Sequence, residues 1–400
     1  MRLRVLMVIH TPWTRDLGGP RAQLELGEEL AARGDHVEKL SYEDAFPPAP
    51  QARPGTAGRL LDFLRSNRSF AARARDHVRA HGHRFDVIDA NQTDLPFPKE
   101  DLGFSGLLVA RSVGLIPAYD RFERWARRRW PEPSPARAAR DLAHRALTWP
   151  GYRRRLRDVE RSFRHADLIN VSNRDDLEEV ARMGFGGKAV AFPFGLPEER
   201  REAFRRARAG VEERLAARTV AFIGAWNSRK GAKDWPEIVQ RVRGRVPDAR
   251  FLFLGTGLGP EHVLRDFPVA AREAVEVVPR YRGEELPGLL SRATVGAFPG
   301  YLEGFGFSVL EKLAAGLPTV AYDAPGARES LRRLARPDMV PAGDTAAFAE
   351  RVAGLLELPA ERWAALSEEA LAAAARLSWR EIAAETRAVY LDRLERLRRS

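Results

Sequence analysis

The sequence of 400 residues contains no cysteine. Without thiols, the chain cannot form a disulfide, a thiolate nucleophile or a cysteine-ligated metal site. Long apolar runs are also missing, and no stretch approaches the ~20 apolar residues that span a bilayer. The apolar run Val5–Ile9 is shorter than the ~7–15 residues of a signal-peptide core. We therefore expect a cytoplasmic protein that is not integral to a membrane, with this first run forming a strand.

Lysine is absent from residues 121–164, whereas arginine is abundant there. This segment has 14 arginines against five acidic residues and accounts for most of the net charge of +11. The rest of the chain is close to neutral, which argues against a protein that coats nucleic acid. Trp125, Trp130 and Trp149 lie among the arginines. The pattern fits a solvated helical face or contact with an anionic membrane surface, and fits less well stacking on single-stranded nucleic acid. We expect no nucleic-acid partner.

Apolar runs of strand length alternate with helical patterns along the chain. A length of 400 residues exceeds what one hydrophobic core usually supports, so two domains are expected. After Val5–Ile9, the strand candidates are DHVEKLSY, FDVIDA, GLLVARS, ADLINVS, TVAFIGAW, ARFLFLG, VEVVP, VGAFPG and PTVAYDA. Continuous apolar strands separated by helices are typical of parallel sheets covered on both faces, which predicts doubly wound α/β domains.

The chain becomes polar and arginine-rich near residues 196–218, and we place the domain boundary there. Residues 1–196 then form an N-terminal Rossmann-like domain and residues 197–377 a C-terminal one, joined by a polar linker near residue 200. The final helical pattern, residues 378–400, offers Trp379, Ile382 and Tyr390 for burial. We expect this last helix to pack back on the first domain.

Residues 299–330 contain the most informative pattern. A glycine-punctuated loop and a helix that starts near Phe307 or Ser308 lie between Glu303 and Glu311. Exposed N–H groups at a helix N-terminus bind anions, whereas carboxylates repel phosphate and accept hydrogen bonds from hydroxyls. The segment therefore predicts a ligand that carries both phosphates and hydroxyls.

This segment resembles the E-x7-E region of the family-four, retaining glycosyltransferases of the GT-B fold. Weaker similarities extend over nearly the whole chain: the pair Gly18-Gly19 after the first strand, Gly195, the segment SRKG around Lys230, and VPAGDTAAFAERVAGLL near the C-terminus. The resemblance implies two Rossmann-like domains facing across a cleft. It also implies that the N-terminal domain binds the acceptor and the C-terminal domain binds a nucleotide-sugar donor.

The resemblance implies a role for each candidate residue of the donor site. Glu303 would bind hydroxyls of the donor sugar, Glu311 would bind the ribose hydroxyls, and Arg282 would line the base pocket. Lys230 and Arg229 would neutralise the diphosphate, so these two and Glu303 are the catalytic candidates. The backbone amides expected to bind diphosphate and sugar are those of Gly304, Phe305, Gly306, Phe307, Ser308 and Val309. Gly18 and Gly19 would allow the backbone of the first domain to approach the donor closely.

The chemistry implied by the resemblance is transfer with retention of anomeric configuration. The departing phosphate helps to deprotonate the incoming hydroxyl on the same face, so no carboxylate nucleophile is compulsory. Lys230, Arg229 and the helix N-terminus stabilise the leaving diphosphate without a metal, in agreement with the absence of an acidic D-x-D triplet. His77 and His81 lack a third-ligand motif, so we expect no metal and no cofactor. The expected acceptor is a glycan or a lipid-linked molecule, which would bring the enzyme to the inner face of the membrane.

Two positions depart from the family pattern. Ala225 stands where relatives commonly have an arginine that binds diphosphate, and Arg229 is the candidate to replace it. Val113 stands where many relatives have a histidine near the reacting sugar, and the acceptor-side candidates for a related role are Asn91, Arg111 and Ser112. Two alternatives stay open. One is a nucleotide-sugar epimerase of similar fold, and the other, which these departures motivate, is a non-catalytic glycosyltransferase-like partner subunit.

Overall fold

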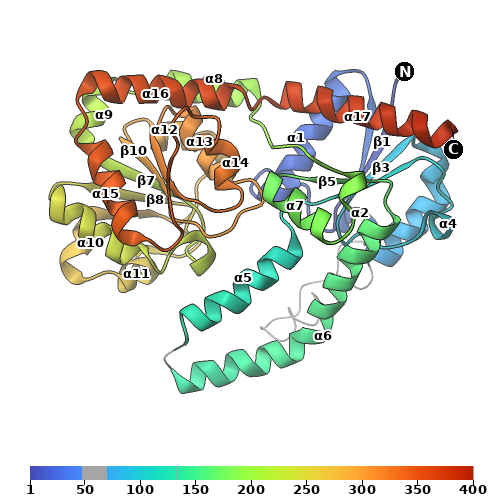
Figure 1. The fold of residues 1–400 in the computed structure, drawn as a ribbon, viewed down its shortest axis with the longest axis horizontal. Helices are drawn as coiled ribbons and strands as arrows, with labels where there is room; N and C mark the ends of the chain where they lie inside the picture. Colours follow the sequence, from blue (N-terminus) through green and yellow to red (C-terminus); the bar gives the residue numbers. More distant parts are fainter. Residues whose placement is uncertain (47–69, 133, 400) are drawn as a thin grey trace. The chain divides into compact units, whose positions relative to one another are not determined.

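The computed structural model describes residues 1–46, 70–132 and 134–399. The chain divides into two compact units, Met1–Phe192 with Trp379–Ser400, and Pro193–Ser378. Within the described ranges, each unit is built on one parallel six-stranded sheet with helices packed against it (Figure 1). The α/β class predicted from the sequence is confirmed.

The first sheet has the strand order β2-β1-β3-β4-β5-β6. Its strands are β1 (Arg4–Val8), β2 (His36–Leu40), β3 (Val87–Asn91), β4 (Leu107–Arg111), β5 (Leu168–Val171) and β6 (Ala189–Ala191). Every residue of β4 and β5 is buried, because helices cover both faces of the sheet. The strand β1 lies between β2 and β3. The chain runs from β1 outward to β2 and then crosses back over β1 to β3, so the direction of strand addition reverses at β1. The carboxyl ends of β1 and β3 are therefore the topological switch point of this sheet.

The last helix of the chain belongs to the first unit. The first unit contains α1 (Gly18–Ala32), α2 (Tyr42–Ala45), a helix over residues 70–81, η1 (Gly82–Arg84), α4 (Lys99–Leu102), α5 (Ile116–Arg129), α6 (Pro135–His165), α7 (Arg174–Arg182), η2 (Gly186–Lys188) and α17 (Trp379–Arg399). The Trp379 indole donates to Glu25 of α1 at 2.6 Å, and Arg387 pairs with Asp35 at 2.7 Å. The first contact attaches α17 to α1 and the second attaches it to the segment that follows α1, although α1 and α17 stand at opposite ends of the sequence.

The second sheet has the strand order β12-β11-β10-β7-β8-β9. Its strands are β7 (Thr219–Ile223), β8 (Arg250–Leu254), β9 (Val275–Val278), β10 (Val295–Phe298), β11 (Thr319–Tyr322) and β12 (Asp338–Val340). The helices are α8 (Glu198–Ala207), α9 (Val211–Ala217), η3 (Ser228–Lys230), α10 (Trp235–Arg245), α11 (Pro260–Val263), η4 (Leu264–Asp266), η5 (Val269–Ala274), η6 (Gly283–Glu285), α12 (Leu286–Leu290), α13 (Phe307–Ala314), α14 (Ala327–Leu331), α15 (Thr345–Leu356) and α16 (Ala360–Ala375). The switch point of this sheet lies between β7 and β10.

The polar stretch near residue 200 is not an open linker, which corrects the expectation from composition. It forms α8 and α9, and both helices belong to the second unit. The Arg214 side chain of α9 is buried and donates to the carbonyl oxygens of Ser291, Ala315 and Leu290 at 2.8, 2.9 and 3.3 Å. A cation next to the final carbonyls of helices is stabilising, so the arginines that suggested a linker in fact attach α9 to the ends of α12 and α13.

Candidate active site

The switch point of the second sheet brings together the two segments that follow β7 and β10. In an open α/β sheet, ligands bind in the crevice beyond the carboxyl ends of the strands at this point. The segment after β7 leads to Lys230, and the segment after β10 leads to Glu303. The Lys230 ammonium nitrogen lies 2.8 Å from Glu303 Oε1. The structure therefore pairs two of the three catalytic candidates.

Arg229 completes this cluster. Its guanidinium donates to Glu303 and, at 2.9 Å, to the carbonyl oxygen of Leu302. Burial raises the pKa of the Glu303 carboxyl, but the charges of Lys230 and Arg229 outweigh that effect and hold the pKa below its usual value. Burial is also the main reason that the pKa of Lys230 is lowered. Glu303 is therefore an ionised carboxylate held between two cations.

Two glycines allow the loops of this cluster to approach one another. Gly231 has φ +84°, and a Cβ there would lie 2.2 Å from the carbonyl oxygen of Pro299. Gly326 also has φ +84°, and a Cβ there would lie 2.6 Å from the Cβ of Glu303. No other residue type fits such spacing in a left-handed backbone conformation. The glycine of the SRKG segment thus brings Lys230 against the loop that carries Glu303.

The loop after Glu303 leads directly into α13. Gly306 precedes the helix with φ +83°, and Phe307 is its first residue. The hydroxyl of Ser308 in the first turn is buried and has no hydrogen-bond partner among the described residues. Because buried polar groups are nearly always hydrogen-bonded, this hydroxyl is available to a ligand at the positive end of the helix. Phe305 and Phe307 both pack on Phe194, at 5.2 and 5.3 Å between ring centroids, and this packing anchors the loop.

Glu311 lies further along α13 and has a different partner. Arg200 of α8 donates to Glu311 Oε1 at 3.0 Å and to the carbonyl oxygen of Gly283 at 2.6 Å. Arg200 was missed in the sequence because 111 residues separate it from Glu311 and it stands in an arginine-rich helix without a distinguishing motif. The structure thus holds each carboxylate of the E-x7-E pair beside at least one cation.

A second lysine, also missed in the sequence, lies beneath the cluster. Lys312 is fully buried and donates to the carbonyl oxygen of Ala297 at 3.1 Å. The ammonium groups of Lys312 and Lys230 lie 5.2 and 5.1 Å from the centre of the Phe298 ring. Burial, and next the charge of Lys230, lowers the pKa of Lys312 to about 7. The charges of Arg200, Arg229 and Lys230 exceed those of Glu303 and Glu311, so the site favours an anionic ligand.

Arg282 is not part of this cluster. Its side chain is 73% exposed, and its guanidinium pairs with Glu284 and Glu285 at 3.3 and 3.1 Å. The neighbouring carbonyl of Gly283 is the group that approaches the site, because it accepts the hydrogen bond from Arg200. In this segment the structure therefore brings backbone, rather than the arginine side chain, towards Glu311.

The switch point of the first sheet holds a histidine–carboxylate pair that the sequence analysis missed. His10 follows β1 and Asp94 follows β3, and the His10 Nδ1 atom lies 2.9 Å from Asp94 Oδ1. The backbone N–H of His10 also donates to Asp94, at 2.9 Å. The Asp94 charge raises the pKa of His10. A signal was present, since each residue closely follows a predicted strand, but the order of the strands was needed to bring the two together.

Gly18 and Gly19 are the first residues of α1. A Cβ at Gly19 would lie 3.1 Å from the Val113 side chain, so Val113 lies against this glycine pair. Ser112 is buried, and its hydroxyl has no hydrogen-bond partner among the described residues. The Asn91 side chain, half-buried, accepts from the N–H of Gln92 at 2.7 Å.

Arg111 is part of a buried hydrogen-bond network. Its buried guanidinium donates to Asp89 at 2.7 Å and to the Tyr390 hydroxyl of α17 at 2.9 Å. The Tyr390 hydroxyl in turn donates to Asp89 at 2.6 Å. Burial and the Asp89 charge raise the pKa of Tyr390 well above its usual value, so it remains a neutral donor. This closed network attaches α17 to the sheet and occupies the Arg111 side chain.

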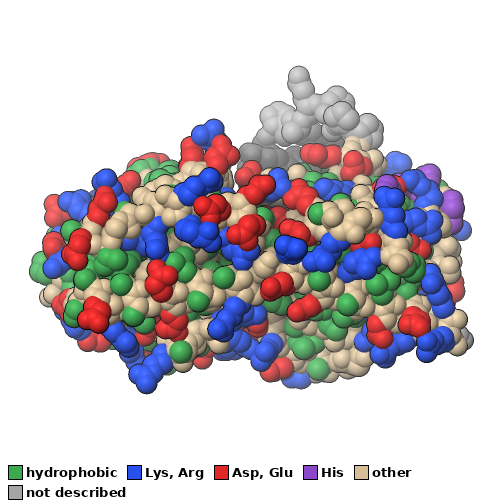
Figure 2. All heavy atoms as spheres, turned by 90° about the horizontal axis from the view of Figure 1, so that it is seen from above, with side chains coloured by type: hydrophobic (Ala, Val, Ile, Leu, Met, Phe, Trp, Pro, Cys, Tyr) green, Lys and Arg blue, Asp and Glu red, His purple; other side chains and the backbone are tan. Residues whose placement is uncertain are grey.

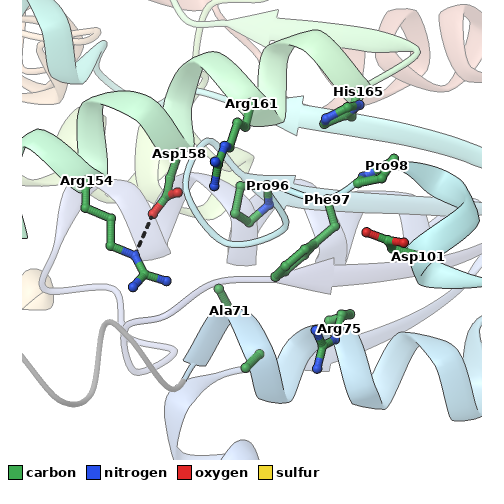
Figure 3. Close-up of a pocket in the computed structure, with 11 residues that line it drawn as sticks. Ala71, Arg75, Pro96, Phe97, Pro98, Asp101, Arg154, Asp158, Arg161 and His165 are labelled. Carbon is green, nitrogen blue, oxygen red and sulfur yellow. Dashed lines mark ion pairs between the residues drawn. The ribbon is translucent and has the colours of Figure 1, made fainter.

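A cavity of about 430 Å³ opens elsewhere in the first unit (Figure 3). It lies between the residue 70–81 helix, the segment before α4, and the C-terminal half of α6. Arg75, Arg154 and Arg161 line it together with Asp101 and Asp158. Arg154 and Asp158 pair at 3.5 Å, and burial raises the pKa of Asp158. None of the site residues predicted from the sequence lines this cavity.

The structure thus has two doubly wound α/β units, each on a parallel six-stranded sheet, with a cation–carboxylate cluster at the switch point of the second. Residues 217–358 match the family of group 1 glycosyl transferases. The chain is 33% identical over 418 aligned residues to D-inositol 3-phosphate glycosyltransferase of Mycolicibacterium paratuberculosis, an alignment that covers 94% of this chain and 86% of the relative. The chain belongs to the group 1 glycosyltransferases.

Solved structures show the same fold over the whole chain. Sucrose-phosphate synthase of Thermosynechococcus elongatus has a TM-score of 0.71 at 18% identity, with 98% of this chain and 99% of that chain covered. Anabaena Alr3699/HepE in complex with UDP-glucose has a TM-score of 0.61 at 15% identity, with 97% and 100% covered. At these identities the likeness establishes the GT-B fold, which confirms that part of the prediction.

Proposed function

We propose that this glycosyltransferase transfers a sugar from a nucleotide-sugar donor to a hydroxyl acceptor with retention of anomeric configuration. The observation that carries the proposal is the contact of Lys230 and Arg229 with Glu303 at the switch point of the second sheet. The cluster has cations for a diphosphate and an ionised carboxylate for sugar hydroxyls. The first turn of α13 adds N–H groups and the unpartnered Ser308 hydroxyl.

In the proposed complex, the diphosphate replaces Glu303 as the partner of Lys230 and Arg229. The freed Glu303 carboxylate then accepts hydrogen bonds from the donor sugar. Glu311 accepts from the ribose hydroxyls, and Arg200 holds its carboxylate in place. The exchange leaves the Glu303 carboxylate without a cation, and the sugar hydroxyls supply the hydrogen bonds it then needs, which favours binding of the complete nucleotide sugar over the nucleotide alone.

In the proposed reaction, the bond between the sugar anomeric carbon and the diphosphate oxygen breaks while the acceptor oxygen bonds to the same face of that carbon. The acceptor proton passes to the departing phosphate. Negative charge develops on the diphosphate, and Lys230, Arg229 and the positive end of α13 stabilise it. These fixed cations supply the charge that a divalent metal provides in other transferases, so we propose a metal-independent enzyme without a cofactor.

The comparisons guide the choice of substrates. One structural neighbour was solved with UDP-glucose, so UDP-sugars are the first donors to test. The relative named for D-inositol 3-phosphate acts on a hydroxylated, phosphorylated acceptor, and we propose an acceptor that is a polyol, glycan or lipid-linked hydroxyl compound. Among the described residues, no helix has both the length and the apolarity needed to cross a membrane. We propose action in the cytoplasm, at the inner face of the membrane where the acceptor is lipid-linked.

The first test is thermal unfolding of the full chain with UDP-, GDP-, ADP- and dTDP-sugars. A ligand that binds only the native state raises the melting temperature, and one base is expected to do so. Glu311→Ala removes the ribose contact and should abolish the shift, whereas Glu361→Ala, at an exposed position of α16, should preserve it. The absence of a shift with every nucleotide sugar would refute the donor site.

The second test is turnover with the donor identified in this way. Transfer to an acceptor, with the anomeric configuration of the product read by NMR, supports the proposal if the configuration is retained and contradicts it if the configuration is inverted. Conversion of the nucleotide sugar without transfer would identify an epimerase. Binding without any turnover would identify a non-catalytic subunit, the alternative that Val113 and Ala225 keep open.

A further inference from the structure

The N-terminal half of α6 lacks the packing that usually stabilises a helix. Every residue from Pro135 to Leu147 is exposed, and the buried residues of α6 all lie in its C-terminal half, at Val159, Ser162 and Phe163. Figure 1 shows this half of the helix extending away from the sheet of the first unit. Helices in water depend on packing of an apolar face for most of their stability. We refer to residues 135–149 as the amphipathic segment.

The side chains of the amphipathic segment separate into two halves around the helix axis. With 3.6 residues per turn, Leu142, Leu147 and Trp149 fall on one half, and alanines occupy the remainder of that half. These three side chains are 61, 64 and 48% exposed. The apolar half is therefore continuous and open to solvent. A continuous exposed apolar surface marks an interaction site, whereas apolar residues scattered singly over a surface do not.

The opposite half of the segment is basic. It carries Arg137, Arg140 and Arg145 together with His144, and Asp141 is its acidic residue. In the described part of the chain, none of these three arginines forms an ion pair with a carboxylate, so their charges are not neutralised by the protein. By contrast, Figure 2 shows basic and acidic side chains interspersed on the face of the first unit that carries α17.

Aromatic residues near the segment add a second feature of an interfacial surface. Trp125, near the end of α5, is 41% exposed and packs edge-on against Trp130 at 5.2 Å between centroids. The Arg153 guanidinium lies 6.0 Å from the centre of the Trp149 ring. Tryptophan and arginine side chains both favour the headgroup region of a bilayer, where one part of the side chain is apolar and the other is wet.

We propose that the amphipathic segment lies in the interface of an anionic lipid bilayer, with Leu142, Leu147 and Trp149 inserted among the acyl chains. Basic amphipathic helices with Trp and Leu on the apolar face bind in this way, and anionic lipid attracts the arginines of the polar face. A second copy of this chain is a poorer occupant. Pairing two apolar faces of this segment would cover the leucines and the tryptophan but would leave the arginines of the opposite halves without an anionic partner.

This inference goes beyond the proposed glycosyl transfer and depends on no donor contact. In this arrangement the first unit, which holds the acceptor-side candidates, lies at the lipid surface. A membrane-bound first unit increases the local concentration of a lipid-linked acceptor, because encounter then takes place in two dimensions.

The test is flotation of the full-length protein with vesicles, in the absence of any nucleotide sugar. The protein is expected to float with vesicles of equal parts phosphatidylcholine and phosphatidylglycerol, and much less with phosphatidylcholine alone. The variant Leu142→Gln/Leu147→Gln/Trp149→Gln should lower partitioning at least about tenfold, the effect of losing about one buried apolar side chain. The matched control His144→Gln/Thr148→Gln changes the polar half and should stay within about twofold of wild type.

Thermal unfolding of the variants provides the folding control. Because the substituted side chains are exposed, apart from the half-buried Thr148, both variants are expected to melt with the wild-type protein. Failure of the wild-type protein to float with anionic vesicles would overturn the proposal. So would flotation that the apolar-face variant leaves unchanged, since binding would then be electrostatic only. Sedimentation that shows a dimer abolished by the same variant would assign the face to a second copy instead.

Discussion

Replacing Lys230 with methionine tests the assignment of this residue to the donor diphosphate. Methionine retains most of the apolar stem and removes the ammonium group, which lies 2.8 Å from Glu303 Oε1. A hydrogen bond to a charged group contributes about 1.5–3 kcal/mol. Because Lys230 exchanges one anionic partner for another when the donor binds, we expect the loss of binding free energy to fall in the lower part of this range. A loss of about 2 kcal/mol corresponds to a roughly thirtyfold weaker nucleoside diphosphate.

Calorimetric titration with the nucleoside diphosphate measures this effect directly, and kcat/KM measures it in the transition state. Lys233→Met is the matched control, because Lys233 is exposed and lies three residues further along the chain. The free energy of unfolding should change by less than about 1 kcal/mol, since Arg229 still neutralises Glu303 and a buried ammonium no longer needs desolvation. A Lys230→Met protein that is folded and binds the diphosphate within about threefold of wild type would refute the reasoning.

Three further changes have defined outcomes. Glu303→Gln should leave the affinity for the nucleoside diphosphate within about threefold of wild type but remove the added affinity for the complete nucleotide sugar. Titration with both ligands measures this, and an equal loss of affinity for the two ligands would contradict a sugar contact. Asp94 raises the folded pKa of His10 above 6.5, so this pair stabilises the protein fully below that pH and loses its effect as pH rises through the folded value. Urea unfolding should therefore show Asp94→Asn to be more destabilising at acidic than at alkaline pH. A difference in unfolding free energy that does not depend on pH would argue against the ion pair. Arg214→Met leaves several buried carbonyls unpaired and should lower the free energy of unfolding by about 3 kcal/mol, whereas Arg206→Met, at an exposed position, should have little effect.

Most strands were predictable because parallel strands buried on both faces form continuous apolar runs. The two that were missed, β6 and β12, have three residues each and stand at sheet edges. Neither is fully buried, so neither forms a strong apolar run in the sequence. The stretch near residue 200 was misjudged for a related reason. Arginine-rich composition there indicated solvent exposure, yet Arg200 and Arg214 turn inward to a carboxylate and to helix-terminal carbonyls.

The candidate site was predictable where its chemistry is local. The spacing from Glu303 to Glu311 includes a glycine loop and the start of α13, and those features are properties of adjacent residues. Lys312 is adjacent to Glu311, but its burial was not visible in the sequence. A lysine is usually exposed, and only the close approach of Phe298 and the Ala297 carbonyl places this one in the interior.

The sequence by itself determined the α/β class, the expected two-domain organisation and the polar groups available for a phosphorylated, hydroxylated ligand. These follow from periodicity and from the chemistry of neighbouring residues. Only the tertiary structure decided which distant groups meet, because the order of strands in a sheet is set by packing and not by sequence proximity. It paired Lys230 with Glu303, Arg200 with Glu311 and His10 with Asp94. It also left the apolar half of residues 135–149 exposed, since whether an amphipathic helix is covered depends on what the rest of the chain packs against it.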